Sequence, residues 1–201
     1  MKPKLKLNIE SKKKDTDKEN LSSTPYVNFI DITDEWKQIA KDKISNSTVI
    51  IINKVGIEFD YKGNKYTIDG VRGQKGINVW NDFDEEELNF GNWLRVTFNE
   101  NVKMFPVIRR KYQGVKTPDF VFKEEYWDLK TLTSSNYLSL WENIVDKEEQ
   151  SHNFMFDLSE SSMEYNDFIK GVEIIFFRDK TAFVEKVLIK KNGTFYIFKK
   201  A

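Results

Sequence analysis

The sequence predicts an α/β fold in which a central mixed sheet is flanked by helices. Helical stripes of apolar residues alternate along the chain with short β-branched or aromatic runs, a pattern typical of domains that combine helices with a sheet. Hydrophobic residues make up 39% of the 201-residue chain and charged residues 32%, with sixteen Phe and five Trp. That composition is typical of a globular protein with a packed aromatic core.

The composition also excludes several classes of protein. The chain contains no cysteine, so it can form neither a disulfide framework nor a thiolate metal site. No apolar run reaches the length of a membrane span, and no signal-peptide core follows the basic start. The formal net charge is zero, so any binding of nucleic acid has to come from local basic patches.

Three parts are expected along the chain. Residues 1–24 are rich in Lys, Asp, Ser and Asn and contain almost no aromatic residues, which predicts a disordered basic arm. Residues 25–83 are expected to form a small accessory subdomain. Residues 84–201 carry the longest periodic segments and are expected to form the main domain.

The accessory region begins with the alternating run 26–32, which predicts a strand. Asp34 is the expected N-cap of the helix that follows. The β-branched run 49–59 predicts a second strand. Gly63-Asn64 predicts a turn that leads back through residues 65–68 as the second arm of a hairpin.

The main domain is expected to begin with a helix over residues 84–98, capped by Asp84, with acidic residues in its first turn. Gly91 in the middle of this helix predicts close packing against another element. The remaining elements of the first half are expected as follows: a strand over 102–110, a hairpin over 116–130, a helix from Ser135 or Asn136 to Gln150, and a strand over 153–158.

The last part of the chain is expected to add a helix and three strands. The helix covers about 162–170 and is expected to end at Gly171. The strands are expected over 172–177, 183–190 and 194–199, with Asn192-Gly193 as the turn between the last two.

The hairpin over 116–130, K-T-P-D-F-V-F-K-E-E-Y-W-D-L-K, brings together residue types that suit chemistry. Side chains two apart on a strand share a face, so Asp128 and Lys130 point the same way, and Trp127 and Leu129 are left to bury the other face. Asp119 lies on the opposite arm. Two carboxylates and an ammonium are therefore expected around one small volume.

This set of side chains suits hydrolysis of a phosphodiester. Two carboxylates can hold a divalent metal such as magnesium or manganese, with zinc as a further candidate. Such a cation polarises a phosphoryl oxygen and activates a water. The lysine can position the nucleophile or stabilise the added charge.

The spacing P-D-x8-D-x-K resembles the motif of the PD-(D/E)xK nuclease superfamily. The longer pattern, K-T-P-D-F…W-D-L-K-T, then a helix, then Q-S-x-N-F-x-F-D-L-S, resembles the C-terminal nuclease domains of CdiA-type contact-dependent growth-inhibition toxins. The resemblance covers about residues 84–200, and the expected order of helix, three strands, helix and strand agrees with the αβββαβ core of that superfamily.

The resemblance implies a toxin-like nuclease that cleaves nucleic acid, with RNA, and tRNA in particular, slightly favoured over DNA. It implies a cognate immunity protein as a partner. The expected place of action is the bacterial cytoplasm, after secretion or delivery as a toxin.

The resemblance also implies further site residues. Glu87 is the best match to the acid that the first helix often supplies, with Glu85 and Glu86 as rivals, and capping of the helix explains all three equally well. Gln150 agrees with a glutamine at the helix-to-strand corner. A local phosphate-binding cluster, or cradle, is expected from the basic residues Arg109, Arg110, Lys111 and Lys116, together with Lys130. Exposed strand edges often carry such charges without any role in binding, which is the alternative explanation.

Other functions remain open. His152 is the only histidine, and it can act as the general base or acid of a metal-independent RNase of the barnase/EndoU/colicin/RelE type. The chain can also be a restriction-like DNase of the same superfamily. A third alternative is a non-catalytic adaptor or mobile-element protein that has kept the fold and lost the activity.

Overall fold

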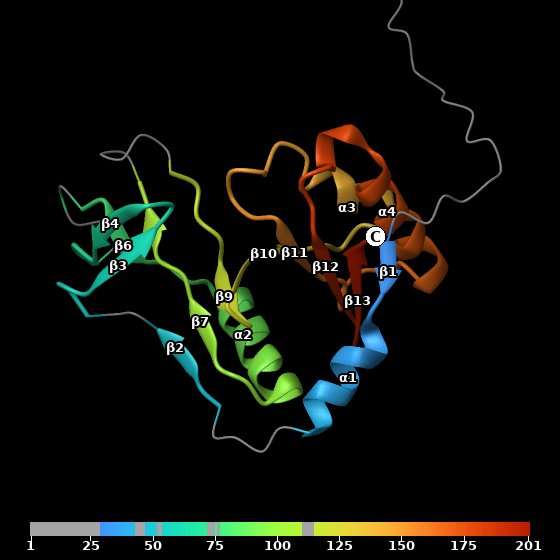
Figure 1. Cartoon of the computed structure of the whole chain (residues 1–201), viewed down its shortest axis with the longest axis horizontal. Coiled ribbons are helices and arrows are strands. Elements are labelled where there is room, and N and C mark those ends of the chain that lie inside the picture. Colours follow the sequence, from blue (N-terminus) through green and yellow to red (C-terminus); the bar gives the residue numbers. More distant parts are fainter. Residues whose placement is uncertain (1–28, 43–46, 52–53, 72–74, 76, 110–114) are drawn as a thin grey trace, which may run out of the picture.

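The computed structural model describes residues 29–42, 47–51, 54–71, 75, 77–109 and 115–201. The arm expected over residues 1–24 lies outside the described residues. One eight-stranded mixed sheet runs through the molecule with helices on both faces, and two small sheets lie beside it (Figure 1). The α/β fold with a central mixed sheet flanked by helices is therefore confirmed.

The strands of the central sheet come from all parts of the described chain. In spatial order they are β1 (Phe29–Asp31), β13 (Thr194–Lys200), β12 (Lys186–Lys191), β11 (Asn153–Asp157), β10 (Glu125–Thr131), β9 (Phe120–Phe122), β7 (Val102–Met104) and β2 (Val49–Ile51). The pairs β10–β11, β11–β12 and β2–β7 are parallel, and the other four pairs are antiparallel. Both edge strands, β1 and β2, precede residue 84, so the sheet takes strands from both sides of the boundary expected there.

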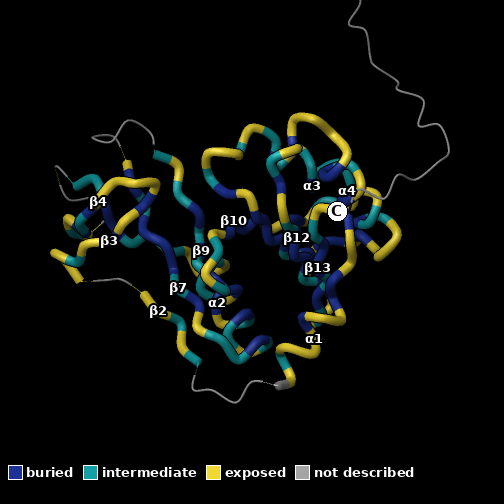
Figure 2. Tube along the Cα trace, in the orientation of Figure 1, coloured by how far each residue is buried: buried dark blue, intermediate teal, exposed yellow. Residues whose placement is uncertain are grey.

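Side chains alternate between two cores, one on each face of this sheet. On β11, Met155 joins the core under α1 (Thr33–Asp42) and α2 (Glu85–Phe98), while Phe154 and Phe156 join the core under α3 (Leu138–Glu142) and α4 (Tyr165–Phe177). Buried residues follow the central strands and the inner sides of the helices (Figure 2). The sheet is thus covered on both faces, as its parallel central pairs require.

The two small sheets lie at the end of the central sheet near β7 and β9. One is the hairpin of β3 (Glu58–Tyr61) and β4 (Asn64–Thr67), and the other combines β5 (Gly70–Val71), β6 (Val79–Asn81) and β8 (Val107–Ile108). A third core of aromatic and branched residues lies between them, and Val121 of β9 packs against it. Residues far before the main domain therefore contact the hairpin that carries the predicted site.

Several predicted elements are confirmed. Asp84 caps α2, since its carboxylate accepts a hydrogen bond from the Glu87 amide at 2.8 Å. The hairpin of β9 and β10, the strand β11 and the Asn192-Gly193 turn between β12 and β13 are all present. The helix α2, strands β7, β9 and β10, helix α3 and strand β11 follow one another in the predicted order, with β8 inserted after β7.

The strand predicted over 172–177 is wrong. Those residues continue α4, which runs through Gly171 to Phe177 and is followed by a short 3-10 turn (Asp179–Thr181). A Cβ on Gly171 would lie 2.7 Å from the Tyr137 carbonyl oxygen. This glycine therefore permits close contact between α4 and the start of α3, and it does not end the helix.

Four element boundaries also differ from prediction. The strand expected over 49–59 is divided between β2 and β3, which belong to different sheets. The strand expected over 102–110 is interrupted at Phe105-Pro106, because proline has no N–H for the ladder. Helix α3 ends at Glu142, and turns fill the stretch to Gln150. Helix α1 begins at Thr33, so Asp34 lies inside its first turn instead of capping it.

Replacing Gly171 by alanine tests the contact between α3 and α4. Alanine is normally favoured over glycine inside a helix by about 1 kcal/mol, but here the added methyl group meets a backbone oxygen. We expect Gly171→Ala to lower the free energy of unfolding by about 1–3 kcal/mol in urea denaturation.

The matched control is Gly91→Ala in α2. Its Cβ would meet the Met104 sulfur at 3.2 Å, and the end of a methionine side chain can shift. We expect a change below about 1 kcal/mol, because the helix propensity gained offsets the shift. A Gly171 variant at least as stable as the parent would contradict the packing described for α3 and α4.

Candidate active site

The hairpin of β9 and β10 places two aspartates opposite each other. Lys123 and Glu124 form its turn with φ of +52° and +64°, as a two-residue type I′ turn requires. The ladder ends where the register pairs Phe120 with Trp127, and Asp119 and Asp128 lie directly beyond that pair on the two arms. The Asp119 backbone N–H donates to the Trp127 carbonyl oxygen at 3.0 Å, one residue out of that register, and so connects Asp119 to the strand that carries Asp128.

The face of β10 on which Asp128 lies is set by its neighbours. Trp127 and Leu129 are buried in the core under α1 and α2, and the Trp127 indole N–H donates to the Phe122 carbonyl oxygen at 3.2 Å. Alternation along the strand turns Asp128 and Lys130 to the opposite face. The prediction that these two side chains share one face is thereby met by the local geometry.

Asp128 is fully buried and has a polar partner on each carboxylate oxygen. Its Oδ1 accepts a hydrogen bond from the Gln150 side-chain amide, and its Oδ2 forms an ion pair with the Lys130 ammonium. Asp119 is held by its own hairpin, because its Oδ2 accepts the Leu129 backbone N–H at 2.6 Å. The structure therefore brings together Asp119, Asp128, Lys130 and Gln150.

Burial makes ionisation of both acids costly. Burial raises the pKa of Asp119 well above its usual range, and the charge on Asp128 raises it further, while the Leu129 N–H and Lys130 oppose the rise. Burial also raises the pKa of Asp128, against the opposing charges of Lys130 and Lys147. A hydrogen bond between the Asp119 and Asp128 side chains also lowers the pKa of Asp128, so the two acids interact directly.

Glu87 is the acid of the first turn of α2 that the structure brings toward this pair. Glu85 and Glu86 are exposed, whereas Glu87 is half-buried. Burial raises the pKa of Glu87 to about 7, with smaller contributions from nearby acids that include Asp84 and Asp128. Its Oε2 also accepts the Asp84 backbone N–H at 3.3 Å, so Glu87 completes a capping box as well.

Two neighbours of the site were not predicted from the sequence. Lys147 lies in the turns after α3, and its positive charge lowers the pKa of Asp128. Its carbonyl oxygen accepts a hydrogen bond from the Gln150 backbone N–H at 2.8 Å. Tyr61 comes from β3, and its hydroxyl donates to the Lys116 carbonyl oxygen at 2.9 Å. Neither residue belongs to the motif, and no spacing in the sequence connects β3 or the turns after α3 with the hairpin.

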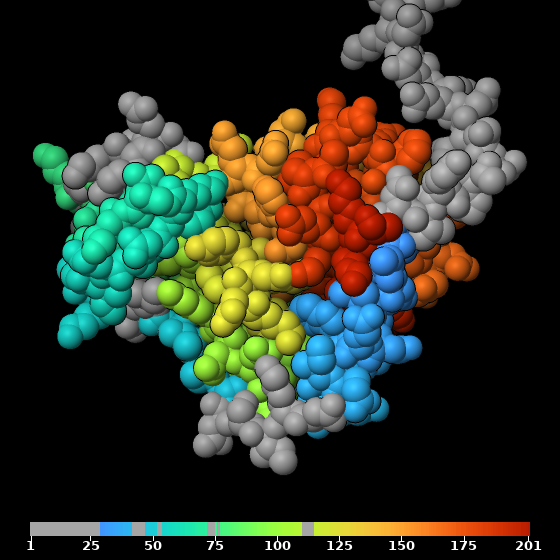
Figure 3. Space-filling model, viewed as in Figure 1, coloured from blue at the N-terminus to red at the C-terminus, as the bar shows by residue number. Residues whose placement is uncertain are grey.

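The β3–β4 hairpin also contacts the segment that carries Gln150. The Lys62 ammonium donates to the Glu149 carbonyl oxygen, and Lys116 forms a 4.0 Å ion pair with Glu149 and donates to the Asp146 carbonyl oxygen at 3.5 Å. In the space-filling view, the hairpin's residues pack beside the chain around β9 and β10 (Figure 3). These contacts hold the Gln150 segment against β10.

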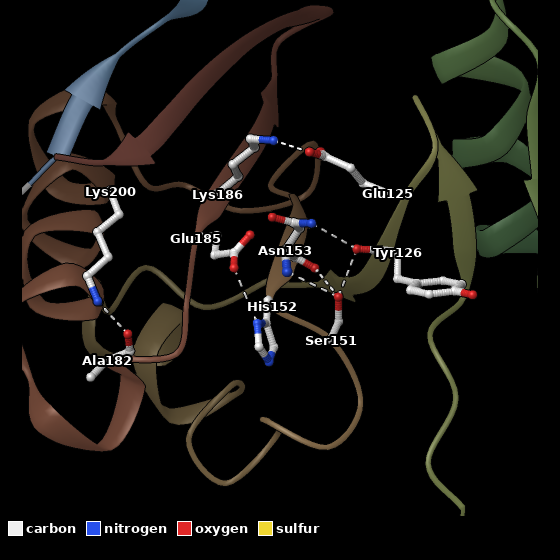
Figure 4. A network of polar contacts seen from close by, with 9 residues as sticks. All are labelled: Glu125, Tyr126, Ser151, His152, Asn153, Ala182, Glu185, Lys186 and Lys200. Atoms are coloured by element: carbon white, nitrogen blue, oxygen red, sulfur yellow. Dashed lines mark hydrogen bonds and ion pairs between the residues drawn. The ribbon is translucent and has the colours of Figure 1, made fainter. Parts of the chain in front are cut away.

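His152 lies beside the site but has different partners. Its Nδ1 is 3.5 Å from Glu185 Oε1 (Figure 4). Its ring centre is 6.0 Å from that of Phe183. Among its contacts within the described residues, none is with Asp119 or Asp128. Its neighbours Ser151 and Asn153 both donate to the Tyr126 carbonyl oxygen, at 2.9 and 3.1 Å, and so join β11 to β10 below the acids.

The basic residues predicted to form a phosphate cradle are only partly described. Arg110 and Lys111 lie outside the described residues. Arg109 is exposed and lies over the Trp80 ring, with 5.4 Å between its guanidinium carbon and the ring centre. Lys116 is exposed and lies next to the turns that lead to Gln150. Among the described cradle residues, Lys116 is therefore connected to the site in addition to Lys130.

The donor set fits a magnesium or manganese ion. Within the part of the chain that the structure describes, no group of three His, Cys, Asp or Glu side chains is placed to hold a metal. Magnesium, however, commonly binds through one or two carboxylates and keeps several waters. The carboxylates of Asp119 and Asp128, which lie close enough to interact, supply that number of ligands.

Fold and side chains together define a mixed α/β domain with an acid–lysine site on one face of its sheet. Residues 116–195 match the family model described as the contact-dependent growth inhibition CdiA C-terminal domain. This part of the chain is therefore similar to the CdiA C-terminal domain. The matched range contains Asp119, Asp128, Lys130, Gln150 and His152, and it begins after Glu87.

Comparison with solved structures finds the CdiA-CT/CdiI toxin and immunity complex from Burkholderia pseudomallei, with a TM-score of 0.44 and 20% sequence identity. The alignment covers 58% of this chain and 89% of that chain. No curated protein sequence matches the chain. None of the helices in the described residues has the length and apolar character needed to cross a membrane.

The pKa of Glu87 predicts a pH-dependent stability. The Glu87 carboxyl group holds its proton more tightly in the folded protein than in the unfolded chain, where its pKa is near 4.5. The stabilisation is therefore complete below pH 4.5 and is lost as the pH rises through about 7. Glu87→Gln cannot ionise, and its amide oxygen can still accept from Asp84. We expect it to raise the free energy of unfolding by about 1 kcal/mol at pH 8, since solvent screens this half-buried group.

Urea denaturation at pH 4 and pH 8 measures this difference. Glu86→Gln, an exposed neighbour in the same helical turn, is the control and should not raise the free energy of unfolding at pH 8, because it removes a charge that the helix N-terminus favours. A Glu87→Gln variant that is less stable than the parent at pH 8 would show that Glu87 is stabilised as an ionised group.

Proposed function

We propose that this toxin domain is a nuclease of the PD-(D/E)xK type that hydrolyses phosphodiester bonds with the help of a divalent metal. The observation that carries the proposal is the convergence of Asp119, Asp128 and Lys130 on one face of the sheet, with Gln150 holding Asp128 from the other side. The family match over residues 116–195 supports a toxin role, because it contains all four residues.

Each of these side chains has a role that its surroundings suit. Asp119 and Asp128 present carboxylate oxygens for a magnesium or manganese ion, which when bound polarises a phosphoryl oxygen and lowers the pKa of a water. Lys130 keeps its ammonium beside Asp128, where it can stabilise the negative charge that develops on the phosphate. Gln150 fixes the orientation of the Asp128 carboxylate by donating to Oδ1.

Glu87 has a different role in this scheme. Because its pKa is raised to about 7, it can exchange a proton near neutral pH. A glutamate of that kind can accept the proton of the attacking water, or remain as a further negative group beside a bound cation. The exposed Lys116 and the partly buried Lys147 add positive charge around the acids, which suits a polyanionic substrate.

RNA is the proposed substrate, with tRNA favoured, and a cognate immunity protein that covers the site is the proposed partner. The support is the match to a family of contact-dependent growth inhibition. The matched Burkholderia pseudomallei structure is itself a toxin and immunity complex. Action inside the bacterial cytoplasm after delivery is part of the same proposal.

The substrate proposal is tested by incubating the purified chain with total tRNA, ribosomal RNA and plasmid DNA. Each reaction is run with magnesium, manganese or zinc and with a chelator. Cleavage of tRNA that stops in chelator is the expected result. Cleavage of plasmid DNA alone would replace RNA by DNA as the substrate, and cleavage of RNA in chelator would favour the metal-independent RNase alternative.

Asp128→Asn tests the metal role directly. The amide is nearly isosteric and keeps an oxygen for Gln150, so the fold should survive, while the charge that holds the cation is removed. We expect cleavage to fall by at least about 100-fold with an unchanged circular dichroism spectrum. Lys130→Ala should lower turnover by about 100-fold and leave metal affinity largely unchanged, since the lysine is not a ligand.

His152→Ala is the matched comparison. Because His152 contacts Glu185 and Phe183, its loss should change cleavage by less than about threefold if the metal scheme holds. The metal scheme fails if His152→Ala abolishes cleavage while Asp128→Asn retains full activity in chelator. That pattern would be expected of an RNase that uses histidine as its general base.

A further inference from the structure

Tyr126 is an exposed aromatic residue on the strand that carries the proposed catalytic acids. It lies two residues before Asp128 on β10, and 40% of its surface is accessible. Side chains two apart on a strand share a face and are separated by about 7 Å along it. Tyr126 therefore lies on the same face as Asp128 and Lys130, within the length of one nucleotide.

Buried rings hold Tyr126 in place. Its ring centre lies 5.3 Å from that of Tyr61 and 5.6 Å from that of Phe105, with interplanar angles of 84° and 87°. Tyr61 and Phe105 are themselves 2% and 4% exposed. The Tyr126 backbone is fixed as well, since its carbonyl oxygen accepts from both Ser151 and Asn153 (Figure 4). An aromatic ring held this firmly loses little conformational freedom when it binds a ligand.

Positive charge lies beside the neighbouring Tyr61 ring. The Lys62 ammonium is 5.2 Å from the centre of the Tyr61 ring, and Lys116 is connected to Tyr61 through the hydrogen bond from the tyrosine hydroxyl. Both lysine side chains contact the segment that leads to Gln150. Proteins bind single-stranded nucleic acid with exposed aromatic rings that stack on bases and with cations in the same region that neutralise phosphates. Here the exposed ring is Tyr126, and Lys62 and Lys116 lie around the Tyr61 ring that packs against it.

We propose that Tyr126 stacks on the base next to the scissile phosphate, and that the substrate is therefore an unpaired nucleotide in a single strand or loop. This inference rests on the proposed function, since it assigns a substrate class to the same site. In a duplex both faces of a base are covered by its stacked neighbours, so a base can reach Tyr126 only where the strand is unpaired.

The test measures binding by Asp128→Asn, so that cleavage does not remove the substrate. The probe is a fluorescent 12-nucleotide RNA in three forms: single-stranded, annealed to its complement, and single-stranded with an abasic residue at each position in turn. Binding is measured in magnesium by fluorescence anisotropy. The Tyr126→Leu change is then added, because leucine fills apolar space without offering an aromatic face.

We expect the single strand to bind at least about fivefold more tightly than the duplex, and an abasic residue at one or two positions to weaken binding by about 5- to 100-fold. In the double variant Asp128→Asn/Tyr126→Leu both differences should disappear, and Tyr126→Phe should restore them. Tyr165→Leu is the matched control, since Tyr165 is 45% exposed on α4 and its ring packs against Phe168.

Two results separate the failure of this inference from the failure of the proposed function. If the variant binds single strand and duplex equally, or if Tyr126→Leu leaves the abasic effect in place, the stacking role is wrong while the nuclease proposal stands. If no RNA or DNA probe binds and the parent chain cleaves none, the nuclease proposal is wrong and the stacking role falls with it.

Discussion

The carboxylates of Asp119 and Asp128 face each other across one pair of strands, and the rest of the site depends on how that arrangement is tolerated. Like charges directly opposite on a sheet are destabilising, and burial makes each ionisation more costly. The Leu129 N–H, the Gln150 amide and the Lys130 ammonium each stabilise one of the two acids. These partners come from the hairpin itself and from the corner before β11, so the hairpin and that corner have to be fixed together.

Apolar residues on the opposite face of the sheet fix the position of the hairpin. Trp127 and Leu129 are buried in the core under α1 and α2, so the side chain of Asp128, which lies between them on the strand, points to the opposite face of the sheet. The parallel pairing of β10 with β11 then sets the position of the corner at Gln150. The contacts of Lys62 and Lys116 with Glu149 and Asp146 hold that corner from outside. Burial of apolar residues on one face of β10 thus fixes the polar side chains on the other face.

Patterns in the sequence predicted those features of the structure that depend on residues close together in the chain. Alternation along β10, the acidic capped start of α2 and the Asn192-Gly193 turn could be predicted because each depends on adjacent residues. The continuation of α4 through Gly171 could not be predicted, because glycine is needed there for close contact with the Tyr137 carbonyl oxygen at the start of α3. Tyr61 and Lys147 were missed for the same reason, because only tertiary packing brings β3 and the turns after α3 to the hairpin.

A crystal structure of the chain grown with manganese, with anomalous data collected at the manganese edge, tests the central claim most directly. The account predicts one strong anomalous peak between the side chains of Asp119 and Asp128, about 2 Å from a carboxylate oxygen of each. The peak should be absent from crystals of Asp128→Asn grown in the same way. A peak at another set of residues would contradict the account. So would the absence of manganese between Asp119 and Asp128, together with cleavage of RNA by the same protein in chelator.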